Sequence, residues 1–253
     1  AERFDQCRPE IITNKLKILL QMSLVLTFGL KWQIIRVGRF AGQYAKPRSC
    51  GTETRGGLAL PSYRGDLVNR PEFTPEARRP DPSNLLEGYA RAAMTINFIR
   101  SLLSGGFGDL RNPEAWNLDF VGHSARSGDY KALVAEISGA IRFLESAVGR
   151  SLGQLGPQTL YTSHEGLHLP WESAATERPP LRERWYDLST HFPWIGARTA
   201  SVSGAHVEFF RGIANPIAVK VGPVMDPREL VELIDILDPH GEPGRLTLIH
   251  RLG

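Results

Sequence analysis

The sequence predicts an α/β fold in which parallel strands alternate with helices. Short β-branched runs bounded by Gly or Pro alternate with longer stretches whose apolar residues recur at helical spacing. The strand-like runs also end in polar or charged residues, and parallel strands bring their carboxyl ends to one edge of a sheet. A chain of 253 residues, 42% of them hydrophobic, is long enough for one such domain, and this size is normal for an α/β barrel.

The elements follow one another from the N-terminus. A helix is expected to begin at Pro9 and to end at Gly29, and a β-branched strand follows it. The predicted helices are residues 9–29, 84–103, 129–148, 202–210 and 227–237. The predicted strands are residues 33–38, 159–163, 190–195, 217–221 and 246–250, which is fewer than the eight of a closed barrel. Residues 45–82, rich in Gly, Pro, Ser and Arg, are expected to be a long loop that is either disordered or functional.

Composition argues against several classes of protein. The formal net charge is only +3 and no Lys/Arg-rich block is present, so no nucleic-acid partner is expected. The two cysteines, Cys7 and Cys50, are too few for a disulfide framework and are expected to be reduced. The most apolar stretch, residues 16–30, is predicted to be too short to span a bilayer, and no signal peptide is apparent. A cytoplasmic protein without a membrane partner is therefore expected.

Cations recur where the predicted strands end. Arg39, Arg198, Lys220 and Arg251 occupy such positions, and segment 39–49 adds further cations after the first strand. Arg offers a planar fork to carboxylate or phosphate groups, and Lys offers a compact charge. These residues predict a converging cationic site for a small phosphorylated and carboxylated ligand. A solvated basic loop, or pairing of Lys220 with a structural carboxylate, would explain the same pattern.

Histidine and tryptophan residues are weaker signals. His164 and Glu165 are adjacent, so they would point to opposite sides of a strand, and at most one is expected to face the site. A metal held by both is not expected. Trp171, Trp185 and Trp194 are interpreted as packing anchors.

Long motifs, in the same order along nearly the whole chain, give the sequence a family resemblance. They are GRFAGQYAKPRS at 38–49, YRGD at 63–66, TSHE at 162–165, WIG at 194–196, GAHVEF at 204–209, IANP at 213–216 and DPHGEPGRLT at 238–247. The chain resembles the class-II (plant-type) 3-deoxy-7-phosphoheptulonate (DAHP) synthases. The resemblance implies a (β/α)8 TIM barrel that condenses phosphoenolpyruvate with erythrose 4-phosphate and releases phosphate, the first step of the shikimate pathway to aromatic amino acids.

The resemblance also implies roles for particular residues. The catalytic set is Arg39, Lys46, Arg198, Lys220 and Arg251. Phosphoenolpyruvate would be bound by Arg39, Ala197, Arg198, Lys220 and Arg251, and erythrose 4-phosphate by Lys46, Pro47, Arg48 and Ser49. The cofactor implied is a divalent metal, Mn²⁺ with Co²⁺ or Mg²⁺ as alternatives.

Two departures from the family pattern affect the expected activity. Ala197 stands where the family has Glu next to Arg198. The Cys, His, Glu and Asp that hold the family's metal fall outside this chain, so we expect this chain alone not to bind the metal. We expect residues 1–253 to be a single barrel domain that is incomplete at both ends and contains strands 2 to 6 of the family barrel.

Two other functions are also compatible with the sequence. An aminoDAHP synthase of secondary metabolism would share these motifs. A non-catalytic homologue would keep the fold and bind chorismate mutase or a regulatory amino acid. Ala197 favours the second alternative, whereas the retained cations argue against it. A homo-oligomer is also compatible with the sequence.

Overall fold

The computed structural model describes residues 3–109, 116, 122–148 and 159–250. The chain divides into two compact units. Unit 1 consists of Ala1–Cys7, Arg39–Met94 and Tyr161–Gly253, and unit 2 consists of Arg8–Gly38 and Thr95–Leu160.

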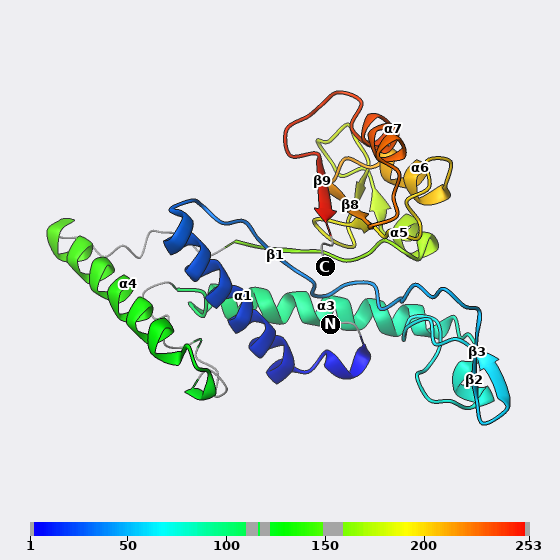
Figure 1. Ribbon diagram of the computed structural model, residues 1–253, viewed down its shortest axis with the longest axis horizontal. Helices are drawn as coiled ribbons and strands as arrows, with labels where there is room; N and C mark the ends of the chain where they lie inside the picture. Colours follow the sequence, from blue (N-terminus) through cyan, green and yellow to red (C-terminus); the bar gives the residue numbers. More distant parts are fainter. Residues whose placement is uncertain (1–2, 110–115, 117–121, 149–158, 251–253) are drawn as a thin grey trace. The chain divides into compact units, whose positions relative to one another are not determined.

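A parallel sheet forms the centre of unit 1. It is three-stranded, with β8 (Ile217–Val221) between β7 (Trp194–Ile195) and β9 (Leu246–His250). Both strand pairs are parallel, so the predicted parallel arrangement is confirmed for these strands. The segment after β4 (Leu160–Thr162) extends this arrangement, because Glu165 forms a parallel bridge with Trp194. Figure 1 shows β8 and β9 side by side.

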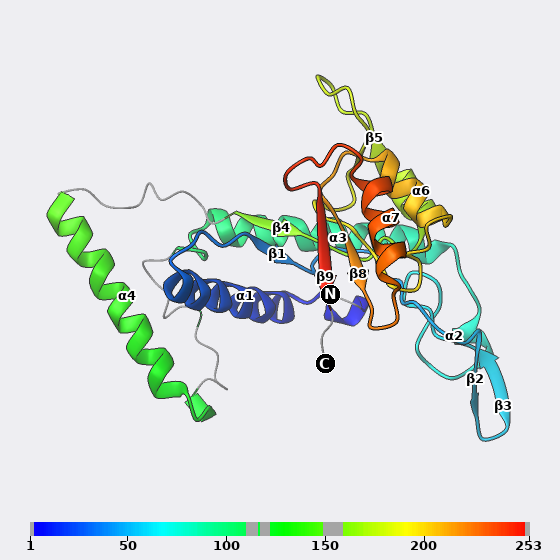
Figure 2. The ribbon, with the colours of Figure 1, turned by 45° about the horizontal axis from the view of Figure 1, so that its top comes forward.

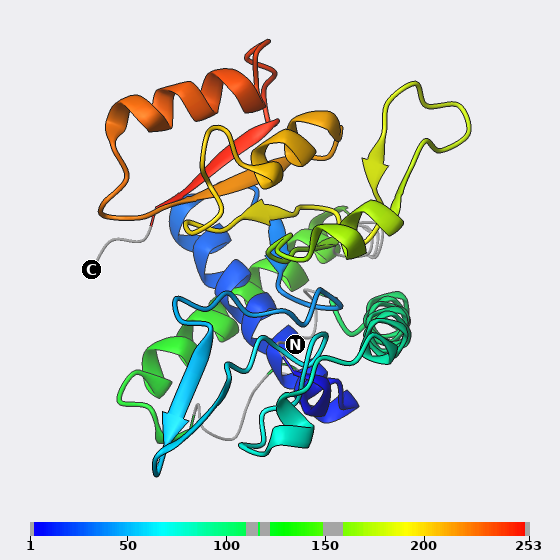
Figure 3. The same ribbon diagram turned by 90° about the vertical axis from the view of Figure 1, so that its right-hand side faces the viewer.

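Two helices cover the sheet and bury its apolar residues. They are α6 (Ala205–Gly212) and α7 (Pro227–Leu237), which Figure 3 shows beside the strands. Asp226 begins α7 as its N-cap, since its side chain accepts a hydrogen bond from the Arg228 N–H and proline follows at the first helical position. The core between strands and helices includes Ile195, Val207, Phe210, Ile213, Ile217, Val219, Leu233 and Leu237. Burial of these side chains is the main stabilising term for this part of the fold.

Short elements complete unit 1, and several of them are visible in Figure 2. They are the 3-10 helix η1 (Phe4–Gln6), α2 (Pro75–Arg78), α5 (Leu169–Ala174), the antiparallel pair β2 (Thr52–Arg55) and β3 (Leu58–Pro61), and the antiparallel pair β5 (Thr176–Glu177) and β6 (Tyr186–Asp187). The long loop expected over residues 45–82 therefore contains short secondary structure, and the alternative of a disordered loop was wrong. Gly56 and Gly57, both with positive φ, close the β2–β3 hairpin, and such a turn is compatible with the Gly-rich composition that suggested a loop.

Unit 2 is helical in its described residues. It contains α1 (Pro9–Leu30), β1 (Arg36–Gly38), α4 (Ser127–Val148) and the C-terminal part of α3 (Ser83–Ser104), whose first residues belong to unit 1. Pro9 occupies the first position of α1, and Lys31 ends the helix in the left-handed conformation with φ 58°.

Helix α1 corrects one prediction about the membrane. Apolar residues 16–30 belong to a helix of 22 residues, because the helix begins at Pro9. Within the described part of the chain, α1 is a helix long and apolar enough to cross a membrane, with 33% of its most apolar stretch buried. Core helices of soluble proteins and signal sequences have the same length and composition, so this feature by itself is weak support for a membrane span.

The predicted elements agree best with the structure where they are long. The predicted helices at 9–29, 84–103, 129–148 and 227–237 match α1, α3, α4 and α7 to within a few residues. The strands predicted at 33–38 and 190–195 are shorter than expected, as β1 and β7. The described residues form a mixed α/β structure, and their strands do not form a closed barrel.

Candidate functional site

Two of the predicted cations meet at one tryptophan in unit 1. The Arg39 guanidinium lies 5.3 Å from the ring centroid of Trp194, and the Lys220 ammonium lies 4.8 Å from it. Trp194 is on β7 opposite Ala218 of β8. Because side chains alternate along a strand, Lys220 projects from the same face of the sheet as Ala218. The sheet thus brings Lys220, and the segment after β1 brings Arg39, to one aromatic side chain, which attracts them through its electron-rich face.

A carboxylate completes this cluster. Glu165 Oε2 lies 4.0 Å from Lys220 Nζ, and the Glu165 side chain is 8% exposed while that of Lys220 is 35% exposed. A Cβ at Gly196 would lie 2.1 Å from Glu165 Oε1, so a larger residue there would require the Glu165 carboxylate to move. The glycine of the WIG motif therefore leaves room for this carboxylate beside Lys220.

The predicted erythrose 4-phosphate residues lie near another predicted cation. Arg198 Nε donates a hydrogen bond to Ser49 Oγ at 3.2 Å, so a residue expected to bind phosphoenolpyruvate contacts one expected to bind the sugar phosphate. Arg48 Nε donates to the Tyr63 carbonyl at 2.6 Å, and the Lys46 N–H donates to the Arg64 carbonyl at 2.8 Å. These bonds attach segment 46–49 to the YRGD motif.

Pro47 is half-buried in this segment, whereas Arg48, Ser49, Ala197 and Arg198 are exposed. Exposed cations can reach an anionic ligand from solvent. Arg251, the remaining predicted cation, lies outside the described residues, so its predicted role stays a prediction.

Beside the cations lies a buried polar network centred on Glu172. Its Oε1 accepts a hydrogen bond from Gln43 Nε2 at 2.5 Å and lies 2.8 Å from His164 Nε2. Its Oε2 accepts from Ser189 Oγ at 2.6 Å. Burial by itself would raise the pKa of Glu172, but the attraction and hydrogen bond of His164 outweigh it and lower that pKa. Burial and the neighbouring Glu172 charge raise the pKa of Asp187 to about 8. At neutral pH Asp187 therefore holds a proton while Glu172 holds a charge.

Comparison with known proteins decides the family. A family model described as the class-II DAHP synthetase family matches residues 1–253. The chain belongs to the class-II DAHP synthetase family. It is similar, at 46% identity over 253 residues, to a protein of Streptomyces coelicolor named phospho-2-dehydro-3-deoxyheptonate aldolase. It is also similar, at 41% identity over 268 residues, to a protein of the same name from Neurospora crassa.

The two matches cover all of this chain but only 56% and 55% of those relatives. This class-II DAHP synthetase family member therefore spans about half the length of the curated relatives it matches.

Within this class-II DAHP synthetase family member, sequence reasoning missed two features of the site. Trp194 was interpreted as a packing anchor, and it is buried, but it also lies against Arg39 and Lys220. The Glu172 network was not predicted, because Gln43 and Glu172 are far apart in the sequence. The expectation that His164 and Glu165 diverge agrees with the structure, since His164 contacts Glu172 and Glu165 contacts Lys220.

The described residues do not fit the divalent metal that the resemblance implies. Across residues 3–109, 116, 122–148 and 159–250, no group of three or more His, Cys, Asp and Glu side chains is arranged to hold a metal ion. Cys7 is half-buried and Cys50 is exposed, and both are free thiols, as expected.

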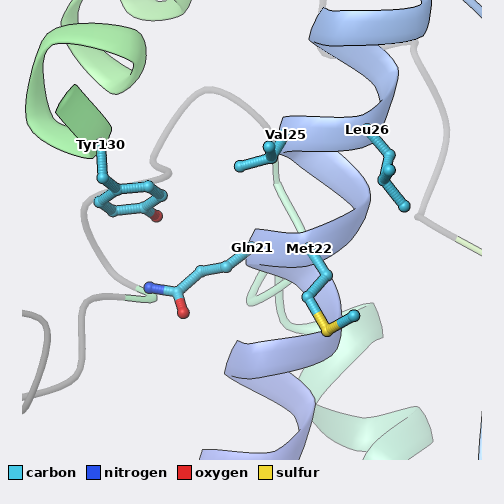
Figure 4. Close-up of a pocket in the computed structure, with 5 residues that line it drawn as sticks. All are labelled: Gln21, Met22, Val25, Leu26 and Tyr130. Atoms are coloured by element: carbon cyan, nitrogen blue, oxygen red, sulfur yellow. The ribbon is translucent and has the colours of Figure 1, made fainter. Parts of the chain in front are cut away.

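A pocket in unit 2 has a different character. Figure 4 shows Gln21, Met22, Val25 and Leu26 of α1 and Tyr130 of α4 around it. Among the described residues, no charged side chain and none of the predicted cations lines it. The pocket is unsuited to a doubly anionic ligand, because burying phosphate without cations or donors is costly.

Proposed function

We propose that this family member supplies the anion-binding residues of a DAHP synthase, which condenses phosphoenolpyruvate with erythrose 4-phosphate. The observation that supports the proposal is the grouping of Arg39 and Lys220 at Trp194, with Arg198 joined to Ser49. The relatives' printed name, phospho-2-dehydro-3-deoxyheptonate aldolase, is consistent with this activity.

The proposed chemistry brings together two anionic substrates. C3 of phosphoenolpyruvate forms a bond to the aldehyde carbon of erythrose 4-phosphate, water adds at C2, and phosphate leaves from C2. Arg39, Arg198 and Lys220 would hold the carboxylate and phosphate of phosphoenolpyruvate, and Lys46, Arg48 and Ser49 would hold the sugar phosphate. Fixed cations lower the repulsion between the substrates and keep the reacting carbons adjacent.

We extend the proposal to the architecture and setting of the protein. Strands β1, β4, β7, β8 and β9 would be neighbours in a (β/α)8 barrel, and the parallel order β7-β8-β9 supports this arrangement. The protein would be cytoplasmic, would work with Mn²⁺, Co²⁺ or Mg²⁺, and would form a homo-oligomer or a complex with chorismate mutase.

The test is a steady-state assay of the full-length gene product with Mn²⁺. Phosphate release is expected to require both phosphoenolpyruvate and erythrose 4-phosphate, with one phosphate formed per phosphoenolpyruvate consumed. Phosphate release that is independent of erythrose 4-phosphate would contradict a synthase and indicate a phosphatase.

A second candidate function is favoured by Ala197. This residue is exposed beside Arg198 and carries no carboxylate where the family has Glu. A non-catalytic homologue would bind phosphoenolpyruvate through the same cations without turning it over. Binding of phosphoenolpyruvate without phosphate release in the assay above would favour this candidate over the synthase.

A further inference from the structure

The buried carboxylate of Glu172 joins three separate segments of unit 1. Gln43 reaches it from the segment after β1, His164 from the segment after β4, and Ser189 from the segment after β6. Glu172 has 0% exposure, so water does not stabilise its charge. A buried carboxylate is stable only when partners surround it, and breaking such a set is costly. The three segments are therefore held together by a strong and specific interaction.

Gln43 transmits this constraint to the loop that carries the proposed substrate cations. Its Oε1 accepts from the His168 N–H at 2.7 Å, and its Nε2 donates to Glu172. Both ends of the amide are engaged, so Gln43 ties the segment between Arg39 and Lys46 to Glu172 and to His168. Gly42 adds close packing, because a Cβ there would lie 2.7 Å from the His164 Cβ.

His164 transmits the constraint to the other side of the site. Its ring nitrogen Nε2 contacts Glu172, and the next residue, Glu165, contacts Lys220 of β8. Glu165 forms a parallel bridge with Trp194, so the same short segment carries the His164 ring to Glu172 and the Glu165 carboxylate to Lys220.

We infer that Glu172 is the positioning residue for both proposed substrate subsites, acting through Gln43 on the loop of Arg39 and Lys46 and through His164 on Glu165. Glu172 is fully buried, so it acts by orienting other groups and does not contact a ligand itself. The identity of the substrates rests on the proposed function, whereas the ordering of the loop by Glu172 does not.

The test exchanges the two ends of the Gln43–Glu172 hydrogen bond in the full-length gene product. Gln43→Glu places two carboxylates in contact, and the double variant Gln43→Glu with Glu172→Gln restores one amide and one carboxylate. Glu177→Gln, which removes an exposed carboxylate outside the network, is the matched control. Gln43→Met, which keeps the length of the side chain but removes its hydrogen bonds, is available if Gln43→Glu does not fold.

Two readouts separate positioning from a general structural role. Gln43→Glu or Gln43→Met is expected to raise the KM for erythrose 4-phosphate at least about tenfold, because a misplaced loop no longer holds Lys46 and Arg48 for binding, with a smaller change in kcat. The rate of backbone amide hydrogen exchange in residues 39–49 is expected to rise in the same variants. The double variant should recover most of both effects, and Glu177→Gln should match the wild type.

The inference would be overturned if Gln43→Glu and Gln43→Met kept the wild-type KM and the wild-type hydrogen exchange. It would also be overturned if the double variant recovered neither the KM nor the hydrogen exchange of the wild type. The hydrogen-exchange result keeps this test separate from the proposed function. If the wild type does not condense the two substrates, the proposed function fails, and the exchange of residues 39–49 still decides whether Glu172 positions the loop.

Discussion

Trp194 combines a structural and an electrostatic role in one side chain. It is 6% exposed and belongs to β7, yet Arg39 and Lys220 both lie against its ring. Two cations on one ring repel each other, and the ring quadrupole and the Glu165 carboxylate reduce that repulsion. A bound anion would reduce it further, so a ligand with two negative groups is favoured at this position.

The ring also holds both cations at one place, so replacing it should disperse them and weaken anion binding. We predict that Trp194→Leu raises the Kd for phosphoenolpyruvate roughly tenfold, because cation–π contacts contribute about 0.5–2 kcal/mol each. Trp194→Phe keeps an aromatic face and should show a smaller increase. Isothermal titration calorimetry measures both values, and a Trp194→Leu variant that binds as tightly as the wild type would show that the ring serves packing only.

The raised pKa of Asp187 leads us to predict that the stability of the folded protein depends on pH. Its pKa is raised to about 8 by burial and by Glu172, and Ser189, Asn215 and His164 are the other polar groups of this network. A raised carboxyl pKa means that the folded state binds more protons than the unfolded state, so stability falls as pH rises from about 4 to about 8. We predict that Asp187→Asn reduces this fall.

Urea denaturation at several pH values checks this prediction. The wild-type unfolding equilibrium constant should rise by up to about tenfold per pH unit from this group, and that contribution should be missing in Asp187→Asn. Equal pH slopes in the two proteins would show that Asp187 is ionised in the folded state.

The sequence pattern predicted where the cations lie, but it did not predict the residues that surround them. Arg39 and Lys220 follow from one local rule, that parallel strands end at a common edge, and the structure brings them together. The pairing of Gln43 with Glu172 depends on tertiary contacts between distant segments. No local pattern encodes those contacts, so the network could not be predicted from a single sequence.

At the scale of elements, the segment over residues 45–82 is built on turns with special backbone geometry. Gly65 has φ +97°, and a Cβ at this position would lie 2.0 Å from the Tyr44 carbonyl oxygen. Gly57 also has positive φ, +80°, but its surroundings are open within 4 Å. Alanine at Gly57 would introduce backbone strain alone, whereas alanine at Gly65 would introduce backbone strain and a steric clash.

We predict that Gly65→Ala destabilises the protein more than Gly57→Ala. The second substitution should cost about 1–2 kcal/mol from left-handed backbone strain, and the first should add the cost of moving the Tyr44 segment. Chemical denaturation measures both changes. Equal losses of unfolding free energy would show that the Tyr44 segment relaxes freely.

The long elements were predictable and the short ones were not. Helices α1, α3 and α4 have 22 residues each, long enough for apolar spacing to be recognised. Strands β5, β6 and β7 have two residues each and exist through their pairing partners. The β2–β3 hairpin was interpreted as a loop for a related reason. Most of its residues are exposed, so its sequence lacks the alternation of buried and exposed residues that marks a strand.

At the scale of the whole molecule, the parallel α/β character was predicted and is observed in β7, β8 and β9. The family resemblance implied strands 2 to 6 of a (β/α)8 barrel for this chain, and the described strands do not form a closed barrel. Closure depends on pairing between the first and last strands of a sheet, which local sequence patterns do not encode. The chain also matches only about half the length of its curated relatives.

The most direct measurement is the binding of phosphoenolpyruvate to the full-length gene product by calorimetry. The wild type and Lys131→Met, which alters an exposed lysine of α4, are expected to bind with the same Kd. Lys220→Met is expected to bind at least about tenfold more weakly, because it removes a cation from the proposed phosphate and carboxylate site. No binding by the wild type, or equal binding by Lys220→Met, would contradict the assignment of this site.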